Sequence, residues 1–254
     1  MSSLIVDARG VGKIFGSGEA RVEALKGIDL SVDSGEFISL IGPSGCGKST
    51  LLRLIADLAT PTSGSLSVNA KTPHEARVDQ DYGIVFQKAT LLDWRTVTKN
   101  VELPLEIMDL DDTSTAGEML DLVQLGEFAD HYPWQLSGGM QQRVAIARAL
   151  VFKPSLLLMD EPFGALDEMT RELMQQEVLR IWRETGTTII FVTHSIPEAV
   201  FLSSRVVVMS RRPGRIAGVI ETDLSYPRDE DTRESPAYYT KVTEVREALR
   251  RLEH

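Results

Sequence analysis

Gly42-Pro43-Ser44-Gly45-Cys46-Gly47-Lys48-Ser49-Thr50 is the stretch that decides how this chain folds. The apolar run Phe37–Ile41 precedes it, and a segment with helical periodicity, Lys48–Leu58, continues from it. The stretch fits G-x-x-x-x-G-K-[ST], in which glycines let the backbone curl around phosphate groups and point its N–H groups inward. A chance glycine-rich turn is the alternative. Because a strand comes before the stretch and a helix after it, we interpret it as a phosphate-binding loop.

The loop also supplies a charge and a hydroxyl. Lys48 offers a point charge to the β- and γ-phosphates of a nucleotide, and Ser49 offers a hydroxyl to Mg²⁺. Thr50 lies at the start of the helix, whose N-terminal dipole favours the same anion. The sequence therefore predicts a nucleotide and Mg²⁺ site formed by the whole loop, namely Gly42, Pro43, Ser44, Gly45, Cys46, Gly47, Lys48, Ser49 and Thr50.

The composition is typical of a globular protein with a sizeable core. The chain has 254 residues, of which 43% are hydrophobic and 25% charged, which excludes wholesale disorder. Lys and Arg number 27 against 37 Asp and Glu, and the net charge of −10 argues against electrostatic binding to nucleic acid or anionic lipid. With one cysteine, no secretory signal and no apolar run of about 18 residues, we expect a cytosolic chain without a membrane span.

Strand and helix patterns alternate along most of the chain. Leu4–Phe15 has the pattern of a strand, and Leu156–Met159 is a continuous apolar run of the kind buried in parallel sheets. Between the strand-rich parts, Val97–Val151 is largely helical, with breaks expected at Pro104 and Gly126. This alternation predicts an α/β fold with a doubly wound sheet and an inserted helical subdomain.

Two carboxylates, Asp160 and Glu161, directly follow the apolar run. Nucleotides bind beyond the carboxyl ends of parallel strands, so Asp160 suits a Mg²⁺-holding role, directly or through water. Glu161 suits a role in orienting or deprotonating an attacking water. Alone, such carboxylates are usually solvated turn residues or helix caps. Beside a phosphate-binding loop, they predict an NTPase.

A second candidate anion site is Ser137-Gly138-Gly139, directly before the helical run Gln142–Leu150. Ser137 is a candidate N-cap, and the start of the helix attracts anions. An ordinary capped helix is the alternative interpretation. Two such helix starts in a chain that also carries a strand-end carboxylate pair favour a nucleotide-binding role.

These motifs resemble the ATP-binding subunit of ATP-binding cassette (ABC) transporters, from about residue 15 to residue 216 and in the family's order. Phe15 is similar to the aromatic residue that stacks on adenine, and Gln87 to the Q-loop glutamine. Asp167 closes a segment similar to the D-loop, and His194 is similar to the switch histidine that contacts the γ-phosphate. Each residue alone has a plainer interpretation: a core aromatic, a surface amide, a helix cap and a histidine satisfied by a partner.

The resemblance implies a single nucleotide-binding domain over residues 1–254. Its P-loop NTPase core, with a mixed or parallel sheet and an antiparallel β subdomain, would span about 1–90 and 153–220. The helical signature subdomain would span about 91–152. The segment 221–254 would be a C-terminal helical extension, which could pack on the core, dimerise or regulate; packing is favoured.

The resemblance also implies a homodimer in which two copies pack head to tail around two ATP molecules. Each ATP would lie between the phosphate loop of one copy and Ser137–Gly139 of the other, and Asp167 would contribute to nucleotide binding. Hydrolysis would remove the γ-phosphate and let the dimer open. The implied catalytic residues are Glu161, His194 and Gln87, and the implied Mg²⁺ ligands are Ser49, Gln87 and Asp160.

The implied membrane partners are permease subunits and, indirectly, an extracytoplasmic solute-binding protein, with this chain at the cytoplasmic face of the inner membrane. The segment Leu91–Val97 is similar to the Q-loop region of importer ATPases for nitrate, sulfonates and taurine, and Arg212–Ile216 is a looser similarity. Asp93 stands where a proline is usual, and Ser195 where an aspartate is frequent, which puts the solute in doubt. The alternatives are an exporter subunit, a non-transport ATPase and a module that binds ATP structurally.

Overall fold

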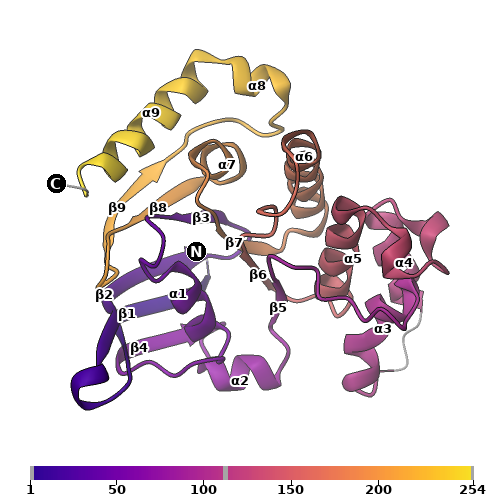
Figure 1. Cartoon of the computed structure of the whole chain (residues 1–254), viewed down its shortest axis with the longest axis horizontal. Helices are drawn as coiled ribbons and strands as arrows, with labels where there is room; N and C mark the ends of the chain where they lie inside the picture. The colour runs from indigo at the N-terminus through magenta and orange to yellow at the C-terminus, as the bar shows by residue number, and fades with distance from the viewer. Residues whose placement is uncertain (1–2, 111–113, 253–254) are drawn as a thin grey trace.

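The computed structural model describes residues 3–110 and 114–252 (Figure 1). The strands are β1 (Leu4–Phe15), β2 (Val22–Asp33), β3 (Phe37–Ile41), β4 (Ser63–Val68), β5 (Tyr82–Val85), β6 (Leu156–Asp160), β7 (Thr188–Val192), β8 (Arg205–Met209) and β9 (Ile216–Glu221). The helices are α1 (Lys48–Ile55), α2 (Pro73–Val78), α3 (Val97–Ile107), α4 (Ser114–Leu122), α5 (Gly138–Leu150), α6 (Glu168–Thr185), α7 (Ile196–Leu202), α8 (Glu230–Glu234) and α9 (Pro236–Arg250). Short 3₁₀ turns are η1 (Gly18–Ala20), η2 (Gly126–Phe128) and η3 (Pro133–Gln135).

The central sheet has six strands in the order β5-β6-β7-β3-β8-β9, parallel except for the β8–β9 pair. Strands β3 and β7 are buried along their whole length, as expected where both faces of a parallel sheet are covered. Leu40 of β3 and Asp160 of β6 both pair with Val192 of β7. The loop after β3 and the carboxylates at the end of β6 therefore emerge at the same level of one sheet edge.

A second sheet, β2-β1-β4, is antiparallel. Its inner face shares a core with α1, whose Leu51, Leu52 and Leu54 are buried. The segment 27–41 is divided between the two sheets, because β2 ends at Asp33 and β3 begins at Phe37. Gly35, at a φ of +77°, makes the turn between β2 and β3, a conformation that favours glycine. The predicted antiparallel β subdomain is thus confirmed, as is the mixed central sheet.

Helices α3, α4 and α5 lie together to one side of the central sheet (Figure 1). The break expected at Pro104 is wrong, because α3 continues through Pro104 to Ile107. The missing N–H of proline removes one helical hydrogen bond, and the helix ends within one turn after it. The break at Gly126 is confirmed by the 3₁₀ turn η2.

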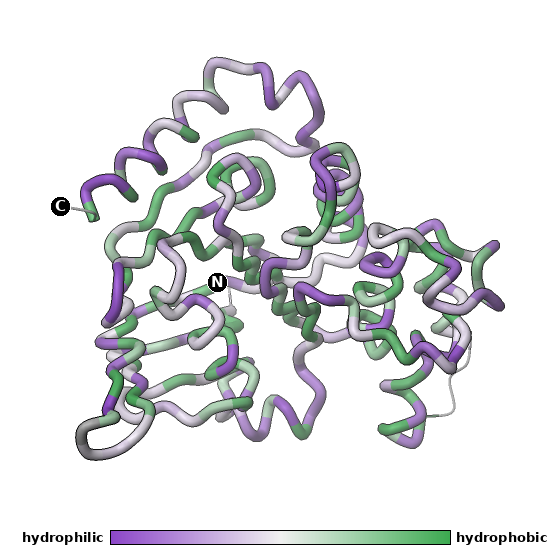
Figure 2. The backbone as a smooth tube through the Cα atoms, viewed as in Figure 1, coloured by the Kyte–Doolittle hydropathy of each residue, from purple (hydrophilic) through white to green (hydrophobic). Residues whose placement is uncertain are grey.

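The C-terminal segment packs against the central sheet through α9, which contacts α7, β8 and β9. Tyr238, Val242 and Val245 are buried there. Arg228 is also buried and donates hydrogen bonds to the carbonyls of Val200, at 2.9 Å, among others. Figure 2 shows hydrophobic residues in the central strands and hydrophilic residues along much of α8 and α9. Within residues 3–110 and 114–252, no helix combines the length and apolar character needed to cross a bilayer.

Candidate nucleotide site

The phosphate loop has the backbone shape that its glycines predict. Gly45 and Gly47 lie at φ of +73° and +103°, where side chains other than hydrogen are disfavoured. A Cβ atom at Gly47 would also come within 2.5 Å of Leu25 Cδ2. Gly47 is the N-cap of α1, so the first N–H groups of this helix face the loop.

Lys48 places its ammonium group inside the loop. Its Nζ donates hydrogen bonds to the carbonyls of Gly42, at 2.8 Å, and Pro43, at 3.4 Å, and the residue is 6% exposed. The positive charge of Lys48 is thus held beside the first two residues of the loop. The thiol of Cys46 is buried, and its Sγ lies 3.9 Å from Lys48 Nζ, so the thiol faces the protein interior.

A cavity of about 270 Å³ opens beside the loop. Residues 44–50 line it, together with Phe15, Glu161 and three residues not predicted for the site: Val22, Ala24 and Arg212. Phe15 is 44% exposed, with Lys13 Nζ 4.9 Å from the centre of its ring, so the ring is free to stack on a planar group. The described lining residues do not include Gly42 and Pro43, whose carbonyls hold Lys48.

Ser49 lines this cavity, and Asp160 lies directly next to Ser49. The Ser49 hydroxyl donates a 2.8 Å hydrogen bond to Asp160 Oδ1. A hydroxyl and a carboxylate are oxygen ligands of the kind that Mg²⁺ prefers, and this ion usually keeps waters and substrate phosphate oxygens as its other ligands. No cluster of three His, Cys, Asp or Glu side chains suited to a metal occurs in the described part of the chain. The pair therefore fits a Mg²⁺ ion that is shared with a nucleotide.

Glu161 is held in an unusual backbone conformation. Its φ is +49°, and its N–H donates to the carbonyl of Val192 at 3.0 Å. A left-handed residue other than glycine carries strain of about 1 kcal/mol or more, which accumulates at functional sites. His194 Nδ1 lies 3.4 Å from Glu161 Oε2. The predicted water-activating carboxylate and switch histidine thus face each other across the edge of the sheet.

Ser137, Gly138 and Gly139 lie away from the phosphate loop. Ser137 caps α5, because its Oγ accepts a hydrogen bond from the N–H of Met140 at 3.3 Å. Ser137 and Gly139 line a separate cavity of about 550 Å³ between α5 and α6, and none of the three is among the described residues that line the phosphate-loop cavity. Within one chain, the structure does not bring the two anion-binding helix starts together.

Gln87 and Asp167 also lie outside the phosphate-loop cavity. Gln87 is exposed, and its amide lies against Gly164, where a Cβ atom would come within 2.8 Å of Gln87 Nε2. The carboxylate of Asp167 caps α6 and accepts from the N–H of Thr170 at 3.0 Å, which lowers its pKa. The nucleotide and metal roles assigned to both residues stay predictions.

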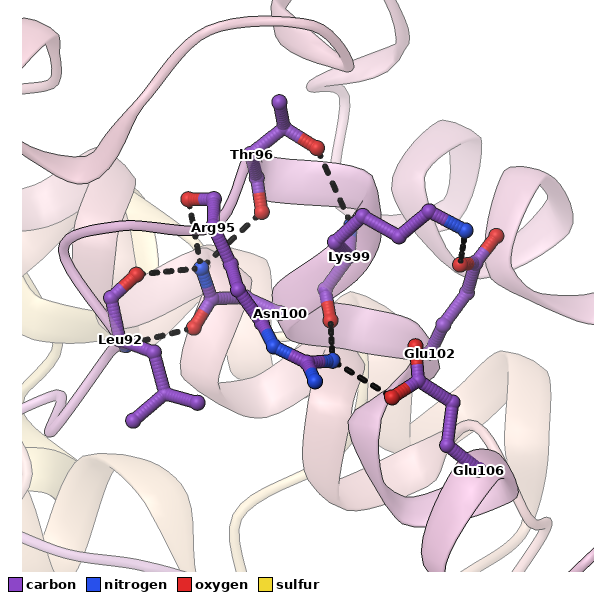
Figure 3. Close-up of polar contacts among 7 residues, drawn as sticks. All are labelled: Leu92, Arg95, Thr96, Lys99, Asn100, Glu102 and Glu106. Carbon is purple, nitrogen blue, oxygen red and sulfur yellow. Dashed lines mark hydrogen bonds and ion pairs between the residues drawn. The ribbon is translucent and has the colours of Figure 1, made fainter.

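A groove of about 380 Å³ runs between Gln87 and Gly138. The chain between the lining residue Leu91 and α3 is ordered by the buried side chain of Asn100 (Figure 3). Asn100 Nδ2 donates to the carbonyls of Leu92, Arg95 and Thr96 at 3.0–3.1 Å, and its Oδ1 accepts from the N–H of Leu92 at 2.7 Å. One amide thus fixes the segment between Gln87 and α3.

Arg212 is the charged residue among the three lining residues that the sequence did not predict for the site. It lies on the β8–β9 connection, which is fastened to the phosphate loop at Gly214: a Cβ atom there would come within 1.9 Å of the Cys46 carbonyl oxygen. The N–H of Gly214 donates to the carbonyl of Ala24 at 2.9 Å, and its carbonyl accepts from Lys26 at 3.0 Å. Gly214 was the available sequence signal, because only glycine permits so close a backbone contact.

Comparisons with known proteins agree with this geometry. The profile of the family described as "ABC transporter" matches residues 25–164. An uncharacterized ABC transporter ATP-binding protein of Methanocaldococcus jannaschii is 48% identical, over 92% of this chain and 88% of that protein. The aliphatic sulfonates import ATP-binding protein SsuB of Bacillus thuringiensis subsp. konkukian is 42% identical, over 94% of each chain. The structure is also similar to an ATP-binding cassette dimer in a post-hydrolysis state bound to ADP and Pi, with a TM-score of 0.73, 37% identity, and 85% of this chain and 98% of that chain covered.

Proposed function

This chain belongs to the ABC transporter family of ATP-binding proteins, and from that premise we propose that it is the ATP-hydrolysing subunit of an importer for a small solute. The observation that carries the proposal is the meeting of three groups at one sheet edge: the phosphate loop, the Ser49–Asp160 pair and the Glu161–His194 pair. Together they provide anion binding, metal binding and a base for water.

The residues divide the work of ATP hydrolysis between them. The loop N–H groups and Lys48 bind the phosphates, and the ring of Phe15 supports the adenine. Ser49 and Asp160 hold Mg²⁺, which neutralises phosphate charge when bound. Glu161 orients the attacking water and accepts its proton. His194 contacts the γ-phosphate and holds it in position relative to Glu161. Gln87 would act on the same site after moving toward it.

A second copy of the chain completes each site. Ser137–Gly139 is an anion-binding helix start that its own phosphate loop does not use. Head-to-tail pairing would place it over the phosphate loop of a partner. The similar cassette, which is a dimer bound to ADP and Pi, supports the pairing of two copies.

The groove beside Gln87 suits a helix of a permease subunit. Trp94 directly follows Asp93, which lines the groove, and 74% of its surface is exposed; an exposed aromatic residue is a frequent anchor of interfaces. Such docking would keep the chain at the cytoplasmic face of the membrane, with a solute-binding protein outside it. The sulfonate importer among the relatives and the Leu91–Val97 segment favour an anion of the nitrate, sulfonate or taurine class. The division into a core (1–90, 153–220), a signature subdomain (91–152) and an extension (221–254) remains part of this proposal.

Affinity purification of the tagged chain from detergent-solubilised membranes tests the proposal. We expect integral membrane subunits to co-purify and the complex to hydrolyse ATP. The complex formed with Lys48→Ala should assemble but lose hydrolysis, because the loop lacks its point charge. A chain with which no integral membrane subunit co-purifies would contradict transport, and a complex that does not hydrolyse ATP would contradict the assigned chemistry.

A further inference from the structure

Buried polar side chains connect the C-terminal helix α8 with the loop that carries His194. Arg233 of α8 donates through Nη2 to Gln175 Oε1 of α6 at 2.5 Å. Gln175 in turn donates through Nε2 to Glu198 Oε1 of α7 at 3.3 Å. Gln175 and Glu198 are 2% and 6% exposed, so water does not offer either side chain an easy replacement partner.

The connection ends on both sides of His194. The hydroxyl of Thr193 donates to Glu198 Oε2 at 2.5 Å and accepts from the N–H of Ser195 at 2.9 Å. The Ser195 hydroxyl accepts from the N–H of Glu198 at 3.4 Å. The residues before and after His194 are therefore both held by one hydroxyl, which is itself held by Glu198.

The same groups surround a small cavity next to the catalytic carboxylate. Glu161, Thr193, His194 and Glu198 all line it, and so does Arg171, whose Nε lies 3.7 Å from Glu198 Oε1. The Glu198 carboxyl group is held by polar contacts with Arg171, Gln175 and Thr193. A change in the position of the Glu198 side chain would thus move Thr193 and change the distance between His194 and Glu161.

We infer that Arg233 and Gln175 are positioning residues that act on His194 through Glu198 and Thr193. The inference rests on the proposed function and assigns a task to the C-terminal extension. Without Arg233, the Oε1 atom of Gln175 loses its donor and the amide can turn away from Glu198. ATP binding stays intact, because α8 does not border the phosphate-loop cavity.

Two substitution pairs test the connection at its two ends in the purified full-length chain. In the wild type, the guanidinium carbon of Arg233 lies 3.6 Å from the centre of the Phe201 ring. Arg233→Met keeps an apolar side chain over this ring but removes the hydrogen-bond donors. Arg233→Lys keeps a donor, and Arg246→Met is the matched control on the exposed side of α9. Thr193→Val removes the hydroxyl at nearly constant volume, and Thr193→Ser restores it.

The expected result is a fall in kcat with little change in KM or in the Kd of ATP. We expect kcat to fall about threefold for Arg233→Met and about tenfold for Thr193→Val, with partial recovery in the Lys and Ser variants. Adding Arg233→Met to Thr193→Val should cause no further loss, because both variants break one chain of contacts. Arg246→Met should match the wild type.

Each other outcome has a distinct meaning. An Arg233→Met variant with wild-type kcat, or one whose loss multiplies with that of Thr193→Val, contradicts the connection. Equal losses in kcat and in ATP affinity indicate a general loss of structure and also contradict it; thermal unfolding of each variant identifies this case. A wild-type chain that does not hydrolyse ATP contradicts the proposed function itself.

Discussion

The Ser49 hydroxyl lies 2.8 Å from Asp160 Oδ1, although 111 positions separate the two residues in the sequence. The contact exists because β3 and β6 both pair with β7, which lies between them and brings their carboxyl ends to the same level. In the proposed function, a nucleotide bound to the loop after β3 would therefore meet Asp160 at the end of β6 and Glu161 directly after it. Hydrolysis needs both, and neither strand alone supplies them.

Mg²⁺ dependence tests the Ser49–Asp160 pair. Asp160→Asn removes the carboxylate charge, so the Mg²⁺ concentration for half-maximal hydrolysis should rise about tenfold or more. Ser49→Ala should shift it in the same direction. Binding of ATP measured in EDTA should change little in either variant, because the phosphate loop is intact. An unchanged Mg²⁺ dependence would show that these residues do not hold the ion.

The affinity for ATP tests the position of Arg212. No hydrogen bond or ion pair engages its guanidinium within residues 3–110 and 114–252, and it borders the phosphate-loop cavity. Arg212→Gln should raise the Kd of ATP about three- to tenfold, and the effect should shrink at high salt. Arg215→Gln is the matched control, because Arg215 lies near Gly27 on the other side of the connection. Equal Kd values of ATP in the two variants would show that Arg212 does not contact the bound nucleotide.

The pH dependence of stability tests the burial of Glu198. Burial raises the pKa of this carboxyl above its ordinary value of 4.5, against the opposing effects of Thr193, Arg171 and His194. Between these two pKa values unfolding releases a proton, so the free energy of unfolding decreases as pH rises through this window. Glu198→Gln should remove this contribution. Urea unfolding from pH 4.5 to pH 8 gives the free energy of unfolding of the wild type and of Glu198→Gln. If this free energy changed with pH in the same way in both proteins, the raised pKa of Glu198 would be contradicted.

The phosphate loop and the strand-end carboxylates could be predicted because their chemistry is local. Glycines at fixed spacing allow few backbone shapes, and an apolar run with no alternation fits a strand buried on both faces. Gly42–Thr50 and Asp160–Glu161 therefore lie where the sequence placed them. The fold class followed from the same motifs.

Features that depend on distant segments could not be predicted in this way. Arg212 reaches the cavity only because Gly214 packs on Cys46, and the buried amide of Asn100 has its role only where three carbonyls converge on it. The alternation in Ser65-Leu66-Ser67-Val68 fits a strand, but nothing in the sequence of β4 indicated that it pairs with β1. Proline in the last turn of α3 likewise shows that tertiary packing can outweigh local preference.

In the proposed cycle, two copies close around ATP and hydrolysis lets them part. Glu161→Gln keeps the shape of the side chain but removes the base, so ATP should bind without being consumed. Adding Ser137→Arg to this variant should block the second helix start and serve as the control. Comparison of the two proteins separates nucleotide binding from closure.

Light scattering of Glu161→Gln with ATP and Mg²⁺ is the most direct measurement. We predict a mass twice that of the 28.1 kDa chain with ATP, and a single-chain mass with ADP or in the Ser137→Arg control. Single chains of Glu161→Gln under saturating ATP and Mg²⁺, both alone and together with the membrane partner, would contradict the account.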